Sequence, residues 1–486
     1  MTRRVDLLVA GAGVYGVCVA YEACRRGLSV LLVDRGDVGG GASSNSLKVA
    51  HGGLRYLQSL DLARCFESIR ERRRWLRIAP RHVRPLRVRM DLGGHGAVYR
   101  LALRAGLLVN EVLSAHRNRG VAPERRLPRA AYPCWYDALI EAPERVLMAL
   151  LHTAESVAPG RLEVRTYAAL RGLVHEEGRL VAADVEGLGR VAVGALVRCT
   201  GAAGNEAPAV LAMNLVFGPL PLLSDGCAVG LAHPRDGRNA FAVPWRGLSM
   251  LGTWNRAYPH DPAEPLRLEP AWVEECLDWL RATHPSLAPL RRGDVRLVHA
   301  GLLPAAPGSR DEPADRFRVA LRPDGSIDVR GVKWTTAYGV ARQAAELAVA
   351  RLGRGVAGPL PDAPLLDDGA LLEAYLDAHA GRREPLLPGV PGPLAGELGF
   401  AVEREWARHL DDVLLRRLPL ATGGHPGPEL VAAVADRLAE QLGWTPEERS
   451  DQVLTFDQSF HFAGNTRSGA GFPTALPARD AAPERA

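Results

Sequence analysis

The stretch VDLLVAGAGVYGVCVAYEACRRGLSVLLVD, residues 5–34, holds two short apolar runs on either side of a segment with helical spacing. The first run leads into Gly11, Gly13 and Gly16, and residues 14–26 follow with apolar residues at helical intervals. The second run, LSVLLVD, ends at Asp34. This order predicts a buried strand, a glycine turn, a helix and a second buried strand, as at the start of a parallel α/β sheet.

The three glycines have the spacing GxGxxG, and Asp34 follows them at roughly the 20-residue interval of a ribose-binding acid. Glycines let the backbone approach a pyrophosphate, and the helix N-terminus offers it N–H groups and a partial positive charge. We therefore predict a dinucleotide site at Gly11, Gly13, Gly16 and Asp34. A tight strand-to-helix turn without a ligand is the alternative.

Two later blocks have the same strand-and-turn character. ALVRCTGAAG, residues 195–204, is an apolar strand that ends in Thr-Gly, and it resembles the late strand of flavoproteins with two dinucleotide-binding motifs. The block that begins IDVRGVKWTTAYGVARQ at residue 327 predicts a strand, a glycine turn and a helix with small residues on one face. Thr335 and Thr336 are expected to cap that helix. The residues that we expect beside the cofactor are Thr200, Gly201, Gly331 and Thr335.

Composition limits the function classes. At 486 residues with 47% hydrophobic content the chain can form two or three domains, and a dispersed net charge of +5 gives no support for nucleic-acid binding. The seven cysteines form neither a CxxC pair nor a metal-ligand spacing, which favours a reducing cytoplasm. No stretch reaches the roughly 18–20 charge-free apolar residues of a spanning helix, so at most we expect peripheral association with the cytoplasmic face of a membrane. Nine arginines between residues 70 and 89 are interpreted as a solvated helix face.

The blocks divide the chain into domains. The segments between them are mixed strands and turns with many prolines and tryptophans, as in a substrate domain inserted into a cofactor domain. A Pro-, Gly- and Asp-rich linker at 355–370 precedes amphipathic helical stretches at 399–418 and 428–444. The boundaries that we expect are 1–90, 141–205 and 300–355 for the cofactor domain, 91–140 and 206–299 for the substrate domain, 366–460 for a helical domain and 461–486 for a flexible tail.

Lysine is nearly absent from this chain. The 60 basic residues comprise 58 arginines and two lysines, Lys48 and Lys333. Where arginine serves as the general cation, a position that keeps lysine is expected to need a compact ammonium on a flexible stem. Chance is the alternative explanation.

Both lysines lie in stretches that resemble the FAD-dependent glycerol-3-phosphate dehydrogenases. SSNSLKVAHGGLRYL at 43–57, with APRHVRPL from Ala79, is similar to that family's Ser-Ser pair, lysine, His-Gly-Gly-Leu-Arg-Tyr-Leu and Ala-Pro-His-Leu-Val-Arg-Pro-Leu. GVKWTTAY resembles its Gly-Gly-Lys-Leu-Thr-Thr-Tyr-Arg, and EREWARHLDDVLLRRL resembles its C-terminal helices. The resemblance implies an α/β (α+β overall) chain: a GR2-type FAD-binding Rossmann-like domain, an inserted β-rich substrate domain and a C-terminal helical domain. It also implies hydride transfer from a secondary alcohol to FAD, with the electrons passed to an acceptor such as quinone or oxygen.

The same motifs supply candidate site residues. Alcohol oxidation needs a base for the hydroxyl proton and a cation near the developing alkoxide. His51 is the best base, with Arg55 one turn later and Tyr56 beside it, although a structural turn histidine is the alternative. The resemblance adds Arg322 and Lys333 as substrate or flavin-ring contacts. It adds Ser43, Ser44 and Lys48 at the FAD phosphates, or Lys48 at a carbonyl that fixes their loop. Trp135 and Tyr136, an aromatic pair that precedes Asp137, resemble a family stretch near the active site, but we interpret the pair as core packing.

The substrate side departs from the family pattern. Leu303, in GLLPA, stands where the family's Gly-Val-Arg-Pro-Leu has an arginine that helps to hold the substrate phosphate. FGPLPLL offers no histidine, and Ala337 and Tyr338 replace the family's Tyr-Arg. Losing a charged donor removes roughly 1.5–3 kcal/mol of bonding to a phosphate. Our hypothesis is therefore a polyol, sugar-like or other hydroxylated substrate.

Three alternatives remain open at this point. A true glycerol-3-phosphate dehydrogenase would have to work without that arginine. An amine or amino-acid oxidase of the glycine-oxidase-like group would share the GxGxxG and the Thr-Gly, but the His-Gly-Gly-Leu-Arg-Tyr motif argues against it. A flavin-binding protein without turnover is the third.

Overall fold

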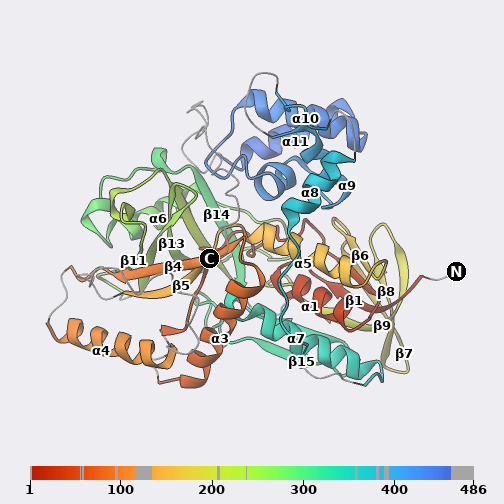
Figure 1. The fold of residues 1–486 in the computed structure, drawn as a ribbon, viewed down its shortest axis with the longest axis horizontal. Helices are drawn as coiled ribbons and strands as arrows, with labels where there is room; N and C mark the ends of the chain where they lie inside the picture. The colour runs from red at the N-terminus through yellow and green to blue at the C-terminus, as the bar shows by residue number, and fades with distance from the viewer. Residues whose placement is uncertain are drawn as a thin grey trace.

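The computed structural model describes two large sheets and a group of helices beside them (Figure 1). Two features expected from the sequence, Arg55 and the tail at 461–486, lie outside the described residues. The described residues are 3–54, 56, 60–93, 97–114, 134–204, 208–236, 238–355, 360–378, 382–387 and 393–460.

The first sheet has the strand order β15-β16-β9-β1-β2-β6, with β8 and β7 attached to β9. Its centre is parallel: Leu7 of β1 is paired with Val30 of β2 and with Ala195 of β9. Both faces of β1 are covered, which explains its continuous apolar run. The strands are β1 (Arg3–Ala10), β2 (Val30–Val33), β6 (Leu162–Arg165), β7 (Leu170–Glu176), β8 (Arg179–Val185), β9 (Gly189–Arg198), β15 (Arg318–Leu321) and β16 (Ile327–Arg330).

Three helices cover one face of this sheet, α1 (Val14–Arg25), α5 (Pro143–Val157) and α7 (Trp334–Arg351) (Figure 1). The β7–β8 hairpin packs on the other face, where Leu180 and Ala183 meet Leu8 and Leu31. The strand, glycine turn, helix and strand predicted from residues 5–34 are confirmed, and so are the later strand and the strand, turn and helix from residue 327.

The second sheet is mostly antiparallel, with the order β14-β10-β13-β12-β11-β4-β5-β3. Its strands are β3 (Val49–Ala50), β4 (Val83–Met90), β5 (Cys134–Ile140), β10 (Ala209–Phe217), β11 (Ala228–Ala232), β12 (Asn239–Trp245), β13 (Leu248–Ala257) and β14 (Leu297–Pro304). Helix α6 (Pro270–Arg281) packs against it. Along the chain, α3 (Leu62–Ile78) lies between β3 and β4, and α4 (Ala97–Ser114) lies between β4 and β5.

The strands of the two sheets do not follow the domain boundaries that we expected from the sequence. We assigned β3 and β4 to the cofactor domain, but they pair with β5, and β14, which spans the expected boundary at residue 300, pairs with β10. The alternating apolar residues of β4 explain this, because Leu86, Val88 and Met90 belong to the core of the second sheet.

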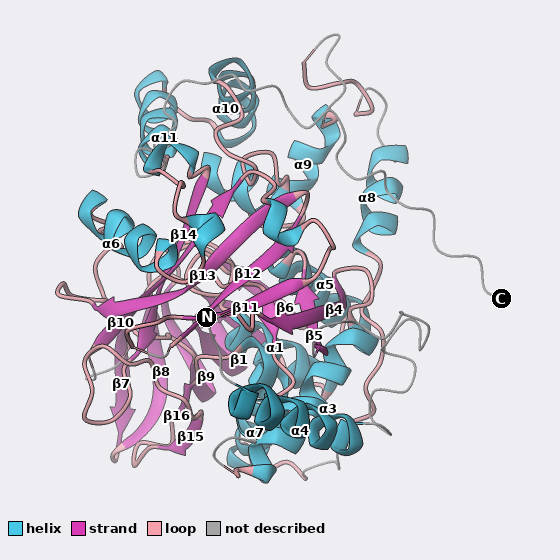
Figure 2. Ribbon diagram, turned by 90° about the vertical axis from the view of Figure 1, so that its left-hand side faces the viewer, coloured by secondary structure: helices cyan, strands magenta, loops and turns pink. Residues whose placement is uncertain are grey.

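The third part consists of α8 (Asp368–Asp377), α9 (Ala395–Glu403), the π-helix η4 (Asp412–Arg417), α10 (Pro428–Leu442) and α11 (Pro446–Gln458). We call residues 368–460 the helical domain; in Figure 2 its helices α10 and α11 lie above the strands of the second sheet. The single helix expected at 399–418 is broken. Trp406 has a positive φ of 59°, and the Asp412 carboxylate accepts the N–H groups of Arg408 and His409 where the chain turns helical again. Among the described helices, none is long and apolar enough to cross a membrane.

The glycine turn is fixed by close backbone contact. Gly11 has φ +103°, and a Cβ added there would lie 2.4 Å from the carbonyl oxygen of Cys199, just after β9. A Cβ on Gly16 would lie 1.7 Å from the carbonyl oxygen of Gly11. The turn can therefore sit between β1 and β9 only with glycine at these positions.

We expect Gly11→Ala to lower the free energy of unfolding by at least about 2 kcal/mol, since the methyl group meets rigid backbone and the φ is unfavourable. Thermal unfolding followed by circular dichroism would measure the loss. Gly293→Ala is the control, because a Cβ there meets no atom within 4 Å. Equal unfolding temperatures for the two variants would contradict this account of the turn.

Candidate active site

A cavity of about 2660 Å³ lies between the two sheets and reaches the helical domain. It is larger than the roughly 300–1,000 Å³ of an ordinary small-ligand pocket. Its walls include the glycine turn, the loop at 40–49, the segment after β9, the β16–α7 turn and β14. The predicted site residues found in its lining are Gly11, Gly13, Asp34, Ser43, Lys48, His51, Tyr56, Thr200, Gly201, Gly331, Lys333 and Thr335.

The turn and the end of β2 are joined by hydrogen bonds. The Asp34 carboxylate accepts the N–H of Ala12 at 2.6 Å and that of Gly36 at 2.8 Å, and Ser43 Oγ accepts the N–H of Val14 at 2.9 Å. Burial raises the pKa of Asp34, while the two N–H bonds oppose that rise. An acid, a glycine turn and a hydroxyl therefore face one cavity at a helix N-terminus.

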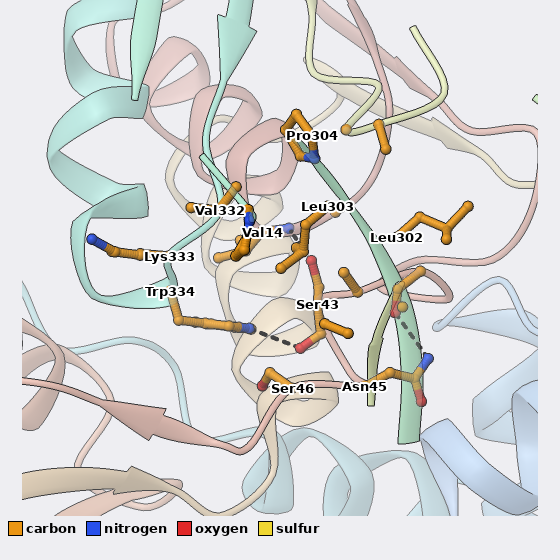
Figure 3. Close-up of a pocket in the computed structure, with 18 of the residues that line it drawn as sticks. Val14, Ser43, Asn45, Ser46, Leu302, Leu303, Pro304, Val332, Lys333 and Trp334 are labelled. Carbon is orange, nitrogen blue, oxygen red and sulfur yellow. Dashed lines mark hydrogen bonds between the residues drawn. The ribbon is translucent and has the colours of Figure 1, made fainter. Parts of the chain in front are cut away.

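Lys48 holds the loop that carries Ser43. Its ammonium donates to the carbonyl oxygen of Ser44 at 2.7 Å and lies 4.9 Å from the ring centre of Trp245. Its side chain is 2% exposed and its φ is +64°. Trp334 Nε1 donates to the carbonyl oxygen of Ser43 at 2.8 Å (Figure 3). Of the two roles expected for Lys48, these contacts match the bond to a loop carbonyl.

His51 and Asp137 form a pair at the cavity. Nδ1 of His51 lies 3.0 Å from Asp137 Oδ2, and the imidazole is 46% exposed. Burial raises the pKa of Asp137, but the His51 bond and Arg72 outweigh it and hold that pKa below its ordinary value. The ionised carboxylate can only accept, so Nδ1 carries the proton and Nε2 is the nitrogen able to accept one.

Asp137 is itself held by neighbours. Its carboxylate accepts the N–H of Gly52 at 2.6 Å and Nε1 of Trp135 at 3.2 Å, and Arg72 lies 3.7 Å away. Trp135 belongs to the core of the second sheet, in line with the core-packing interpretation of the aromatic pair, while Asp137, to which no role was assigned from the sequence, is bonded to His51. The expected solvated arginine face fails at Arg72, which is 2% exposed because it lies beneath this carboxylate.

Lys333 is the second lysine at the cavity. Its ammonium contacts the hydroxyl of Tyr56 and donates to the carbonyl oxygen of Asp315 at 3.0 Å. Tyr15 Oη donates to the carbonyl oxygen of Lys333 at 2.9 Å, and a Cβ on Gly331 would lie 2.2 Å from the Tyr15 ring. The close contact between Gly331 and Tyr15 thus sets the position of the lysine.

The remaining predicted residues differ in placement. Thr335 lines the cavity, but it does not cap α7, because the N-cap position is Lys333, which makes no capping side-chain bond. The hydroxyl oxygen of Ser44 is buried without a hydrogen-bond partner among the described residues. Arg322 does not line the cavity: it is paired with Asp328, from Nε at 2.6 Å, on the β15–β16 hairpin.

A smaller cavity of about 200 Å³ adjoins the first behind Tyr56 and Lys333. Apart from Lys333, its charged lining residues were not singled out from the sequence, because nothing distinguishes two arginines among 58 or two acids among 55. Arg64 is bonded to Asp61 and to Asp315, at 2.6 Å for the latter, and burial raises the pKa of Glu67 with help from Glu71. The charged side chains of this cavity are Arg64, Glu67, Asp315, Arg316 and Lys333.

The large cavity suits a flavin dinucleotide by its construction. The glycine turn leaves no room for a Cβ, the helix N-terminus faces the cavity, and acid and hydroxyl groups lie beside it. Elsewhere the lining brings together an imidazole, a phenol and an ammonium, which suit proton transfer and alkoxide stabilisation. Among the described residues, no group of three or more His, Cys, Asp or Glu side chains could hold a metal ion.

Comparison with known proteins agrees with this assignment. The family model described as FAD dependent oxidoreductase matches residues 6–347, and the model described as C-terminal domain of alpha-glycerophosphate oxidase matches residues 370–449. The chain is 27% identical to a glycerol-3-phosphate dehydrogenase of Mycobacterium leprae, over 94% of this chain and 88% of that protein. It is 26% identical to the aerobic glycerol-3-phosphate dehydrogenase of Escherichia coli, over 85% and 93%.

The solved structure of a glycerol-3-phosphate dehydrogenase from Bacillus halodurans, complexed with FAD, is similar with a TM-score of 0.69. The match has 19% sequence identity and covers 96% of this chain and 97% of that one, so it shows the fold. The fold class expected from the sequence is confirmed, including the helical domain.

Lys48 should make the stability of the protein depend on pH. Burial lowers its pKa to about 8, from 10.5, with Glu144 opposing and Arg246 adding to the effect. Below about pH 8 the lysine is charged in both the folded and unfolded states, so the cost of burying the charge is present in full. Between about pH 8 and 10.5 folding releases a proton, so the free energy of unfolding should rise with pH by up to about 3 kcal/mol.

Denaturant unfolding between pH 7 and 10 measures this rise. The Lys48→Met variant lacks the proton that Lys48 releases on folding. Its free energy of unfolding should therefore rise less steeply with pH than that of the wild type. Parallel slopes would show that the Lys48 ammonium does not titrate as its burial requires.

Proposed function

The chain belongs to the FAD-dependent oxidoreductase family, and on that premise we propose that it oxidises a secondary CH–OH group of a polyol, sugar-like or other hydroxylated metabolite. The observation that carries the proposal is the pairing of His51 with Asp137, in the cavity that also holds the glycine turn and Lys333. The relatives named above, which are glycerol-3-phosphate dehydrogenases, support the CH–OH chemistry.

Each of these residues has its own role in the proposed alcohol oxidation. FAD, when bound, supplies the acceptor for the carbon-bound hydrogen and its electron pair. Nε2 of His51 takes the hydroxyl proton, and Asp137 orients the ring and stabilises the imidazolium that forms. Lys333, with Tyr56, offers a cation and a hydroxyl to the oxygen as negative charge develops on it. The alcohol thus becomes a ketone, with one proton on the histidine.

The substrate proposal depends on β14. Leu302, Leu303 and Pro304 line the cavity, and in Figure 3 the side chain of Leu303 lies beside Ser43 while that of Leu302 points to the other side of β14. A leucine donates no bond to a phosphate, and an arginine in its place would be worth one to two decades of affinity at roughly 1.5–3 kcal/mol.

The adjoining cavity offers acceptors for hydroxyl groups as well as cations. Asp315 and Glu67 lie there with Lys333, Arg64 and Arg316, and the guanidinium of Arg64 is bonded to Asp61 and Asp315. The hydroxyl groups of a neutral polyol can donate to the two carboxylates.

Three other functions have less support. A true glycerol-3-phosphate dehydrogenase is favoured by the relatives but not by Leu303. An amine or amino-acid oxidase is disfavoured because the relatives named above are glycerol-3-phosphate dehydrogenases. A flavin protein without turnover would not need a histidine oriented by a buried carboxylate.

We further propose that an external acceptor, a quinone or oxygen, takes up the two electrons. Peripheral contact with the cytoplasmic face of a membrane would bring a quinone within reach. Helix α4 supports such a contact, because Leu101 and Leu108 are 70% and 66% exposed on it. Oligomeric contacts are not part of the proposal.

Replacing the base should slow the reaction itself. We expect His51→Ala to lower the rate of anaerobic flavin reduction by roughly 10²- to 10⁴-fold, and Asp137→Asn to lower it by at least about tenfold. Stopped-flow absorbance of the flavin measures both rates. His175→Ala is the control, since His175 is paired with Asp324 on a hairpin strand away from the cavity lining. If all three variants reduce flavin at the wild-type rate, His51 is not the base.

Substrate choice is tested by an anaerobic panel. Neutral polyols should bleach the flavin of the wild type, while glycerol 3-phosphate should do so only at high concentration. Leu303→Arg should improve the apparent affinity for glycerol 3-phosphate by one to two decades. Rapid bleaching of the wild type by micromolar glycerol 3-phosphate would establish the phosphate substrate instead, and ammonia release from amines would establish the oxidase.

A further inference from the structure

The helical domain reaches the dinucleotide site through one buried carboxylate. Asp37, three residues after Asp34, is 5% exposed and is bound by two guanidinium groups of η4. Arg416 Nε lies 2.6 Å from its Oδ2, and Arg417 lies 2.6 Å from Oδ1 and 3.0 Å from Oδ2. We call these three residues the Asp37 clamp.

The clamp lies at the start of the loop that frames the glycine turn. The carbonyl oxygen of Asp37 accepts the N–H of Gly40 at 3.1 Å, and Gly39 N–H donates to the carbonyl oxygen of Ala12 at 3.0 Å. Gly39 in turn accepts the N–H of Ser44 at 3.2 Å. A displacement at Asp37 is therefore passed within a few residues to the turn and to the Ser43 hydroxyl.

The helical domain also forms part of the cavity wall. His409, Asp411, Arg416 and Thr455 line the cavity, as do Asp34 and Asp37. The ring centre of His409 lies 4.0 Å from that of Tyr167, with the two rings tilted by 39°, and the Tyr167 hydroxyl donates to Asp412 at 2.6 Å. The wall beside the ribose-binding acid is thus shared between two domains.

The charges explain why the contact holds. A buried carboxylate without a partner is strongly destabilising, and each guanidinium fork supplies directed charge-assisted bonds. If the loop at 37–44 moves when the cofactor is absent, the two arginines lose their shared partner. Docking of the helical domain and occupancy of the dinucleotide site must then favour each other reciprocally.

We propose that the helical domain is a working part of the FAD site, and that the Asp37 clamp couples its docking to FAD retention. The coupling concerns cofactor binding, so it holds whatever the substrate is. Asp37, Arg416 and Arg417 act as positioning residues: all three hold the loop, and Asp37 and Arg416 also line the cavity.

The first test is the affinity of flavin-stripped protein for FAD, followed by quenching of FAD fluorescence. Asp37→Asn should raise the dissociation constant on the order of 5- to 100-fold, while Arg416→Lys, which keeps the charge but loses the fork, should raise it less. Arg449→Gln is the matched control, because it breaks an exposed pair with Asp436 in the same domain. An unchanged dissociation constant in a folded Asp37→Asn, or an equal loss in Arg449→Gln, would overturn the proposal.

The second test needs no variant, so it decides even if Asp37→Asn does not fold. Hydrogen exchange of the full-length wild type is compared with and without FAD. Residues 405–418 should exchange severalfold more slowly when FAD is bound, and α10, none of whose residues lines the cavity, serves as the internal reference. Equal exchange of residues 405–418 in both states would show that the domain only packs beside the site. No substrate is used, so the result is independent of the alcohol-oxidation proposal.

Discussion

The loop from Asp37 to Lys48 is held in place by hydrogen bonds from several sides. The positions of the proposed cofactor contacts and of His51 depend on this anchoring. Lys48 binds it from within through the Ser44 carbonyl, Trp334 binds it at Ser43, and two arginines bind it at Asp37. The same loop presents Ser43 to the helix N-terminus and leads into β3, from which His51 emerges. Cofactor contacts and the proposed base therefore share one short, well-anchored segment.

That anchoring explains the retained lysine. Its ammonium lies under Trp245 at 2% exposure and donates along a stem that turns back on its own loop. A guanidinium is broader and planar, and it would need several acceptors where this site offers the carbonyl oxygen of Ser44. The sequence could indicate that this lysine is needed, since only two remain among 60 basic residues, but the carbonyl that it binds is visible only in the structure.

The features that were predicted correctly from the sequence are those that depend on residues close together in the chain. The glycine turn, Asp34, the Thr200–Gly201 strand end and the Gly331 turn were predicted because each depends on neighbours in sequence. Asp137 was missed because it meets His51 through the pairing of β3 with β5, where Ala50 is opposite Ala138. The break at Trp406 and the burial of Arg72 likewise depend on tertiary partners, and so does the pairing of Arg322 with Asp328 outside the cavity.

The chain is an FAD-dependent oxidoreductase, and we propose that its cofactor site is built by three parts of the chain and that its substrate wall lacks a phosphate ligand. The most direct test is anaerobic stopped-flow flavin reduction by a neutral polyol carrying deuterium at its carbinol carbon. Cleavage of that bond by hydride transfer predicts severalfold slower bleaching than with the unlabelled polyol. Bleaching at the same rate with either polyol, or bleaching by amines alone, would contradict the account.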